Sequence, residues 1–285
     1  MFAKKIPAGT VEYMTSAVKN ANASTLSLSE REWLAKNPDT PQESLIILAE
    51  DTSISIRYYV ACNPNTPQNT LALLAGDENL QVRKSIAMNP NTSQNTLVTL
   101  ATDKSMVVLW HVARNPNTPQ NTLSALASDV NQDVRQNVAA NPNTPKDTLV
   151  ALAGDKNLDV RYNLTQNPNT PMAVLVSLSE DEELDVRMGV ATHLNTPEKL
   201  CKKIYNKVVQ QDELSENFVS GIIQKNVLDQ TEVLALVALY GEKIAQVVAE
   251  NVLVAKNSVL EKVLTEYNCQ AKTRSTEKEA DLARQ

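Results

Sequence analysis

The chain has 285 residues, of which 42% are hydrophobic and 21% are charged, and these near-globular proportions exclude wholesale disorder. Its formal net charge of −6 argues against nonspecific nucleic-acid binding as the main activity, although a local basic patch is compatible with it. Three scattered cysteines indicate neither a disulfide framework nor a metal site, and the longest apolar run is too short to span a bilayer. We therefore expect a cytoplasmic protein that makes no membrane contact.

A motif with a period of 26 residues dominates the chain. The segment Asn63-Pro64-Asn65-Thr66-Pro67 recurs with small changes and without insertions, and its first asparagine is found at Asn37, Asn63, Asn89, Asn115, Asn141 and Asn167. A degenerate copy begins at His193. A fixed period of this length predicts a solenoid of stacked repeats. Residues 1–30 precede the first full copy and are expected to cap the N-terminal end.

Each repeat is predicted to contain two short helices. Thr66 is expected to cap the first helix and Pro67 to occupy its first position, where the missing N–H costs nothing. In the first copy, Thr40 to Glu43 reads as a capping box. Leucines at spacings of three and four then share one face, and the second helix ends at the next Asn-Pro. No stretch alternates with period two, so we expect no strand.

The repeated unit resembles a known family. It reads Asp-x4-Val-Arg-x2-Val-Ala-x-Asn-Pro-Asn-Thr-Pro-x3-Leu-x2-Leu-Ala, which is similar to the leucine-rich repeat variant family, and its Asp…Val-Arg half resembles HEAT repeats. The resemblance covers residues 31–200 closely and residues 217–264 weakly. It implies an all-α, right-handed solenoid in which an α-helix alternates with a short α- or 3₁₀-helix, without sheet. It also implies a bacterial source.

The best-known relatives in that family carry a cysteine-rich iron–sulfur segment at the N-terminus. This chain has no cysteine before Cys62, so we expect no such cofactor and no metal. The domain organisation that we predict is an N-terminal cap at 1–30 and regular repeats at 31–200. Degenerate repeats and a helical C-terminal cap follow at 201–268, and the charged segment 269–285 is expected to be disordered.

Arginine recurs on the inward half of the second helix, at Arg31, Arg57, Arg83, Arg135, Arg161 and Arg187. An arginine placed there needs an acidic partner, and we expect the aspartate six residues upstream to supply it in a ladder between repeats. The alternative is a basic stripe that binds phosphate. The middle repeat has Leu109 in place of arginine and Ser93 in place of proline, which is expected to leave Asp103 without its arginine. Neutral drift or a specialised ligand contact would explain this departure.

The repeated asparagines occupy a turn in which backbone groups would otherwise lack partners. Asparagine side chains satisfy such groups well, and six copies of one catalytic residue are implausible. We therefore expect these asparagines to be structural.

Aromatic side chains gather at the two outward positions of the second helix. These positions hold both tryptophans of the chain and three of its seven tyrosines, and the candidate binding residues are Trp33, Tyr58, Tyr59, Trp110, His111 and Tyr162. Exposed Trp and Tyr in a row are typical of a binding surface. The alternative is that these rings fill gaps between neighbouring helices.

The sequence contains no phosphate-binding glycine loop, nucleophile elbow, HExxH or CxxC motif, and we expect no catalytic residue and no enzymatic activity. The predicted function is an interaction scaffold for a protein or peptide. The alternative is a nucleic-acid-binding or DNA-repair protein similar to the HEAT-like DNA glycosylases, against which the acidic charge counts. The sequence leaves the oligomeric state open.

Overall fold

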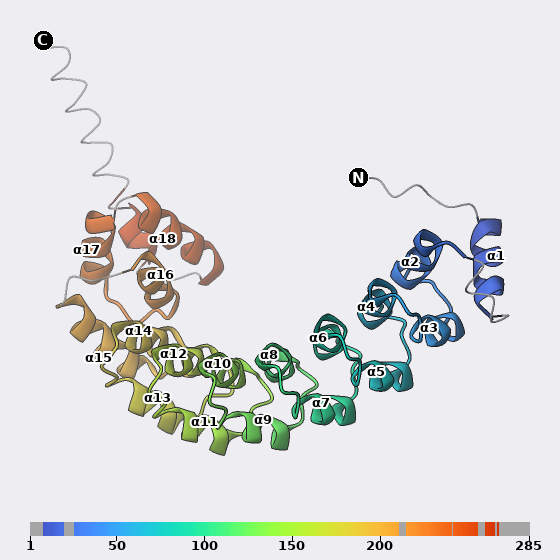
Figure 1. Cartoon of the computed structure of the whole chain (residues 1–285). Helices are drawn as coiled ribbons and strands as arrows, with labels where there is room; N and C mark the ends of the chain where they lie inside the picture. The colour runs from blue at the N-terminus through green and yellow to red at the C-terminus, as the bar shows by residue number, and fades with distance from the viewer. Residues whose placement is uncertain are drawn as a thin grey trace, which may run out of the picture. The chain divides into compact units, whose positions relative to one another are not determined.

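The computed structural model describes residues 8–19, 26–210, 215–240, 242–255, 260–265 and 267, and these residues form helices and connecting turns without any strand (Figure 1). This confirms the predicted all-α solenoid of two-helix repeats. The chain divides into two compact units, Met1–Asn169 and Thr170–Gln285. The predicted disordered tail at 269–285 lies outside the described residues, and the other domain boundaries stay predictions.

The first unit begins with α1 (Ala8–Lys19) and then alternates two kinds of helix. The second helices of the repeats have nine residues each: α2 (Leu28–Lys36), α4 (Ile54–Cys62), α6 (Leu80–Met88), α8 (Met106–Arg114), α10 (Gln132–Ala140) and α12 (Leu158–Gln166). The first helices have seven: α3 (Gln42–Leu48), α5 (Gln68–Leu74), α7 (Gln94–Leu100), α9 (Gln120–Leu126) and α11 (Lys146–Leu152). Both kinds are α-helices.

The second unit starts with a regular repeat, α13 (Met172–Leu178) and α14 (Leu184–Thr192). Less regular helices follow: α15 (Glu198–Val209), α16 (Glu216–Gln224), α17 (Gln230–Tyr240) and α18 (Glu242–Ala255).

Within the first unit, the second helices stack on one another in one row, and the first helices form a second row (Figure 1). The row of second helices lies on the inner side of the curved stack in this unit. The core fills the space between the rows, where Leu71 and Leu74 of α5 and Val82 and Ile86 of α6 are almost completely buried. On this inner side of the stack, each repeat therefore exposes one strip of its second helix, the strip that faces away from the core.

The repeated threonine ends a helix and does not start the next one, so the predicted N-cap was wrong. The Oγ1 atom of Thr66 donates to the carbonyl oxygen of Val60 at 2.6 Å, and Pro67 is the N-cap of α5, which begins at Gln68. Thr40 likewise donates to Leu34, so it forms no capping box with Glu43. The last carbonyls of a helix lack partners within the helix, and the threonine hydroxyl satisfies one of them.

The asparagine ladder is structural, as predicted. The Nδ2 atom of Asn63 donates to the carbonyl oxygens of Ala35 at 2.8 Å and Asn37 at 2.9 Å, both in the preceding repeat, while its Oδ1 atom accepts from the N–H of Asn65. The same bonds to the preceding repeat recur at Asn89, Asn115, Asn141 and Asn167. Each asparagine thus joins the turns of two successive repeats.

Two other side chains replace the asparagine at the end of the ladder, within the second unit. The next ladder position is Val219, which has no polar side chain. The thiol of Cys201 instead donates to Ala191 at 3.2 Å, and the ammonium group of Lys225 donates to His193, so the two carbonyls that an asparagine would bind are satisfied. One repeat earlier, His193 itself stands at a ladder position, and its ring replaces the amide oxygen of an asparagine as the acceptor. Its Nδ1 atom accepts from the N–H of Asn195 at 3.0 Å.

Candidate binding surface on the second helices

The arginine ladder connects successive repeats. The Nε atom of Arg57 lies 2.6 Å from Oδ2 of Asp77, twenty residues downstream, and the same contact recurs at Arg31–Asp51, Arg83–Asp103 and Arg135–Asp155. The upstream aspartate contributes only its backbone: Nη1 of Arg57 donates to the carbonyl oxygen of Asp51 at 2.9 Å. The ladder is therefore confirmed, but the prediction that its ion pair joins an arginine to the aspartate six residues upstream was wrong.

These guanidinium groups are largely buried and ion-paired, so their role is to stabilise the fold. Arg135 is only 7% exposed, and its hydrogen bond to Asp155 raises the arginine pKa and lowers the aspartate pKa. A buried charge that is already ion-paired is not available to bind a phosphate group. The arginines that form these four ion pairs therefore do not form a phosphate-binding stripe.

Leu109 interrupts the ladder at a different aspartate from the one expected. Asp103 keeps its ion pair, because it is bound by Arg83 of the preceding repeat. The aspartate that lacks an arginine is Asp129, twenty residues after Leu109. Its carboxylate accepts from the N–H of Asn131 at 2.8 Å, and no guanidinium among the described residues donates to it.

The outward side of α4 carries a pair of tyrosines. The rings of Tyr58 and Tyr59 meet edge to face with their centroids 5.2 Å apart. The ammonium group of Lys36 lies 3.9 Å from the centroid of the Tyr59 ring, which is a cation–π distance. Both rings are half-buried, so one side of each stays open to solvent.

The outward side of α8 repeats this combination of ring and cation. The rings of Trp110 and His111 are perpendicular, with centroids 4.4 Å apart, and the guanidinium of Arg114 lies 5.4 Å from the Trp110 centroid. Burial, and then the charges of Lys84 and Arg114, lower the pKa of His111 to about 4. His111 is therefore neutral at pH 7 and can both donate and accept a hydrogen bond.

The predicted aromatic residues do not form one continuous cluster. Tyr58 contacts Tyr59, and Trp110 contacts His111, whereas in the described part of the chain no ring contact joins Trp33 on α2 or Tyr162 on α12 to either pair. Tyr162 is 38% exposed and Trp33 is half-buried. The two pairs lie on α4 and α8, and α6 stacks between those two helices (Figure 1).

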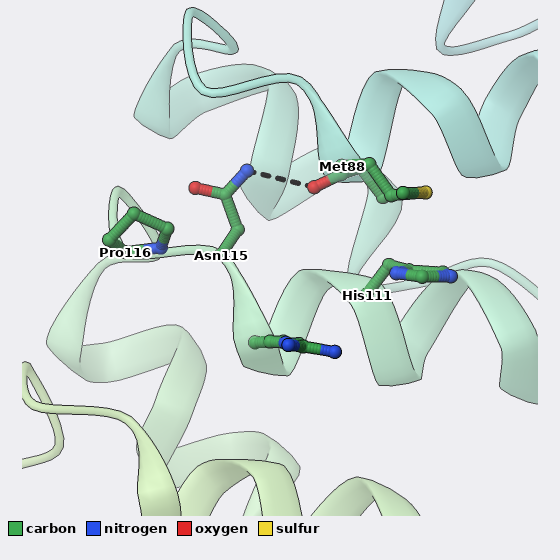
Figure 2. Close-up of a pocket in the computed structure, with 6 residues that line it drawn as sticks. Met88, His111, Asn115 and Pro116 are labelled. Carbon is green, nitrogen blue, oxygen red and sulfur yellow. Dashed lines mark hydrogen bonds between the residues drawn. The ribbon is translucent and has the colours of Figure 1, made fainter.

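A shallow pocket of about 300 Å³ opens where α6 and α8 end. It is lined by Ala87, Met88, His111, Arg114, Asn115 and Pro116, and Figure 2 shows Met88 and His111 side by side at one side of it. Asn115 donates to Ala87 at 2.8 Å and so holds the two repeats together behind the pocket. Met88 and Arg114 were missed by sequence reasoning, although their spacing of one repeat places them in a third outward column.

The second helices in the middle of the row differ in charge from those towards its ends. The helices α4, α6 and α8 contain no aspartate or glutamate, whereas α2 contains Glu32, α10 contains Asp133 and α12 contains Asp159. Lys84 and Arg114 form no ion pair with any carboxylate of the described residues. We call this cationic and aromatic surface the central patch; it comprises Tyr58, Tyr59, Lys84, Met88, Trp110, His111 and Arg114.

Metal clusters and membrane-spanning helices have no candidate in the described part of the chain. No group of three or more His, Cys, Asp or Glu side chains there could hold a metal ion. None of the described helices has the length and hydropathy that crossing a membrane requires.

A family model matches one repeat of the chain, and a solved repeat structure is similar to its fold. Residues 133–157 match the family model described as Leucine rich repeat variant, whereas a search of the curated proteins finds no match. A solved structure described as a leucine-rich repeat variant with a novel repetitive protein structural motif is similar at 20% identity and a TM-score of 0.51, over 73% of this chain and 80% of that chain. YibA of Escherichia coli is similar at 18% identity and a TM-score of 0.48, over 87% and 99%. The chain thus has the helical-repeat fold of a leucine-rich repeat variant, and residues 133–157 form a unit that matches this family's model.

Proposed function

We propose that this chain is a non-enzymatic, cytoplasmic interaction scaffold that binds a protein or peptide along the outward face of its second helices. The binding residues in this proposal are Trp33, Tyr58, Tyr59, Trp110, His111 and Tyr162. Solenoids suit this function because each repeat adds one strip of area to a continuous surface. Trp and Tyr suit it because they carry much of the energy of protein interfaces.

One observation carries the proposal: the register position of Trp110 is not restricted to aromatic residues. The register position of Trp110 holds a tyrosine at Tyr58 and Tyr162, but a lysine at Lys84 and a glutamine at Gln136. The α-helices around these residues have the same length and share three buried positions, those of Val82, Ile86 and Ala87, while α6 also buries Ser85 and α10 also buries Arg135. Because the repeat accepts a lysine or a glutamine there, folding does not explain why α8 has a tryptophan.

The alternative, nucleic-acid binding, has less support. Arg31, Arg57, Arg83 and Arg135 are paired with aspartates of the following repeat, so they are not available to phosphates. The net charge of −6 also disfavours binding of a polyanion such as a nucleic acid.

The test is a comparative capture from an extract of the native host. Wild-type chain, Trp110→Ala and the control Tyr13→Ala are immobilised, and the retained proteins are identified by mass spectrometry. Tyr13 is a suitable control because it is 63% exposed and lies on α1, which carries none of the proposed binding residues. We expect a protein that wild type and Tyr13→Ala retain and Trp110→Ala loses. Identical sets of proteins on all three would contradict the proposal, and retention that nuclease treatment abolishes would favour the alternative.

A further inference from the structure

The central patch differs from its surroundings in charge. On the outward side of α6 and α8, Lys84 and Arg114 have no carboxylate partner among the described residues, and α4, α6 and α8 contribute no carboxylate of their own. Glu32 on α2 and Asp133 on α10 follow directly on either side. The positive stretch is therefore short: the Lys36–Glu32 ion pair bounds it on one side and the carboxylate of Asp133 on the other.

We propose that the central patch binds a short acidic peptide segment, with carboxylates placed against Lys84 and Arg114 and an apolar side chain in the pocket beside Met88. This inference rests on the proposed scaffold function and specifies the chemistry of its partner. Unpaired cations on a surface of otherwise neutral side chains attract carboxylates and repel basic segments.

The pocket supplies the apolar part of this recognition. Met88 and Pro116 present apolar atoms to it, and its volume of about 300 Å³ is ample for one aliphatic side chain. Arg114 lines the same pocket, and its guanidinium lies 5.4 Å from the centroid of the Trp110 ring, a cation–π contact that holds it in place for a carboxylate. An apolar residue next to an acidic one therefore matches the two adjacent features.

The spacing of the helices sets the length of the segment. Packed helices lie about 10 Å apart, so the three helices α4, α6 and α8 span roughly 20 Å. An extended chain advances about 3.3 Å per residue, and about six residues cover that distance. A longer acidic segment would be repelled by Asp133 on one side, and on the other it would meet Lys36 and Glu32, which are already paired and offer it no free cation.

The same boundaries disfavour a nucleic acid. Binding to a phosphate backbone gains affinity from each phosphate that a cation neutralises. The patch offers two unpaired cations, because Lys36 is already 3.3 Å from Glu32. A strand that followed the row beyond α8 would approach the carboxylate of Asp133, and one that continued beyond α4 would meet only the paired Lys36 and Glu32.

The binding test uses the full chain and fluorescein-labelled probes measured by fluorescence anisotropy. The probes are a hexapeptide of alternating glutamate and leucine, the hexapeptide with lysine in place of each glutamate, and a six-nucleotide oligothymidylate. We expect the acidic peptide to bind most tightly, and its affinity to fall as salt is added. Equal or tighter binding of the basic peptide or of the oligothymidylate would overturn the inference.

Charge reversals then locate the site. Lys84→Glu and Arg114→Glu are each expected to weaken binding of the acidic peptide by roughly fivefold in the dissociation constant, because a surface charge contact is lost and a repulsion replaces it. Lys146→Glu is the matched control, since Lys146 is exposed on α11 and the change in charge is identical. An equal loss with Lys146→Glu would show that only net charge matters, and would overturn the site. Lys84→Gln, which adds no repulsion, provides a second variant if Lys84→Glu folds poorly.

The inference and the proposed function can fail separately. If the captured protein needs Trp110 but still binds Lys84→Glu and Arg114→Glu with full affinity, the acidic-peptide inference is wrong and the scaffold function stands. If Trp110→Ala loses no captured protein, the proposed function fails, and peptide binding by the patch is judged from the charge reversals alone.

Discussion

The Nε atom of Arg135 lies 2.6 Å from Oδ2 of Asp155, and its Nη2 atom lies 2.9 Å from Oδ1 of the same carboxylate in the next repeat. The third nitrogen of the guanidinium, Nη1, donates to the carbonyl oxygen of Asp129 at 2.9 Å. One buried arginine therefore connects the loop before its own helix with the loop of the following repeat.

Removing this arginine should destabilise the first unit. We expect Arg135→Leu to lower the free energy of unfolding by about 1–3 kcal/mol, because the carboxylate of Asp155 loses its arginine partner in a partly buried site. The measurement is urea unfolding followed by circular dichroism, with Gln136→Leu, an outward neighbour on the same helix, as the control. Equal unfolding midpoints for Arg135→Leu and wild type would show that the ladder contributes no stability.

The interrupted position offers the reverse experiment. Leu109→Arg should raise the free energy of unfolding by up to about 1 kcal/mol, because the new guanidinium can reach the carboxylate of Asp129 as the other ladder arginines reach theirs. The gain should vanish in a chain that also carries Asp129→Asn. A gain that persists without the Asp129 charge would mean that helix propensity, and not the ion pair, is responsible.

The sequence predicted the repeat, the two helices and the structural role of the asparagines, because period, proline placement and leucine spacing are local signals. It misplaced the partner of each ladder arginine. The distance from Arg57 to Asp51 along the chain is shorter than that to Asp77, but the arginine side chain reaches across the repeat interface. Which of two aspartates faces a side chain depends on how repeats stack, and a single repeat does not contain that information.

His111 should make stability depend on pH. Its pKa in the folded chain is about 4, below the ordinary 6.5, so the unfolded chain binds the proton first and stability falls as the pH drops from 6.5 towards 4. His111→Asn, which copies the residue at Asn137 and Asn163, should reduce this slope. Thermal melts at pH 7, 6, 5 and 4.5 measure the effect.

The ladder aspartates affect the stability of the fold at lower pH than His111 does. The pKa values of Asp77, Asp103 and Asp155 are lowered below 3.8, so their contribution is lost only as the pH falls below about 4. Identical slopes for wild type and His111→Asn between pH 6.5 and 4.5 would contradict the assignment to His111.

The end of the asparagine ladder can be tested at Lys225. Lys225→Met should destabilise the second unit by about 1–3 kcal/mol, because the carbonyl of the buried His193 loses a charged donor. Lys199→Met, at an exposed lysine on α15, is the control. The readout is the loss of helical circular dichroism on heating, and equal losses in the two variants would show that the Lys225 contact is dispensable.

The candidate surface was only partly visible in the sequence. The outward columns of the helical wheel identified Trp110 and Tyr58, because their positions follow from the period alone. The cation–π contacts of Arg114 and Lys36 and the pocket beside Met88 were not predicted, since they join side chains one turn or one repeat apart. Their arrangement depends on rotamers and on the stacking distance, which the repeat period does not determine.

The central claim, that the outward face of the second helices is a binding surface, is tested most directly by the affinity and melting temperature of Trp110→Ala and Tyr162→Ala. The measurement uses the protein captured by the wild-type chain. We expect each variant to weaken binding by about 2 kcal/mol, roughly thirtyfold in the dissociation constant, with little change in melting temperature. Because Tyr162 lies on α12, outside the central patch, its loss reports contacts that the partner protein makes beyond the acidic segment. Tyr58→Ala and Tyr59→Ala should have smaller effects if the contact is centred on α8. A large fall in melting temperature with unchanged affinity would show that the rings are packing elements and would contradict the account.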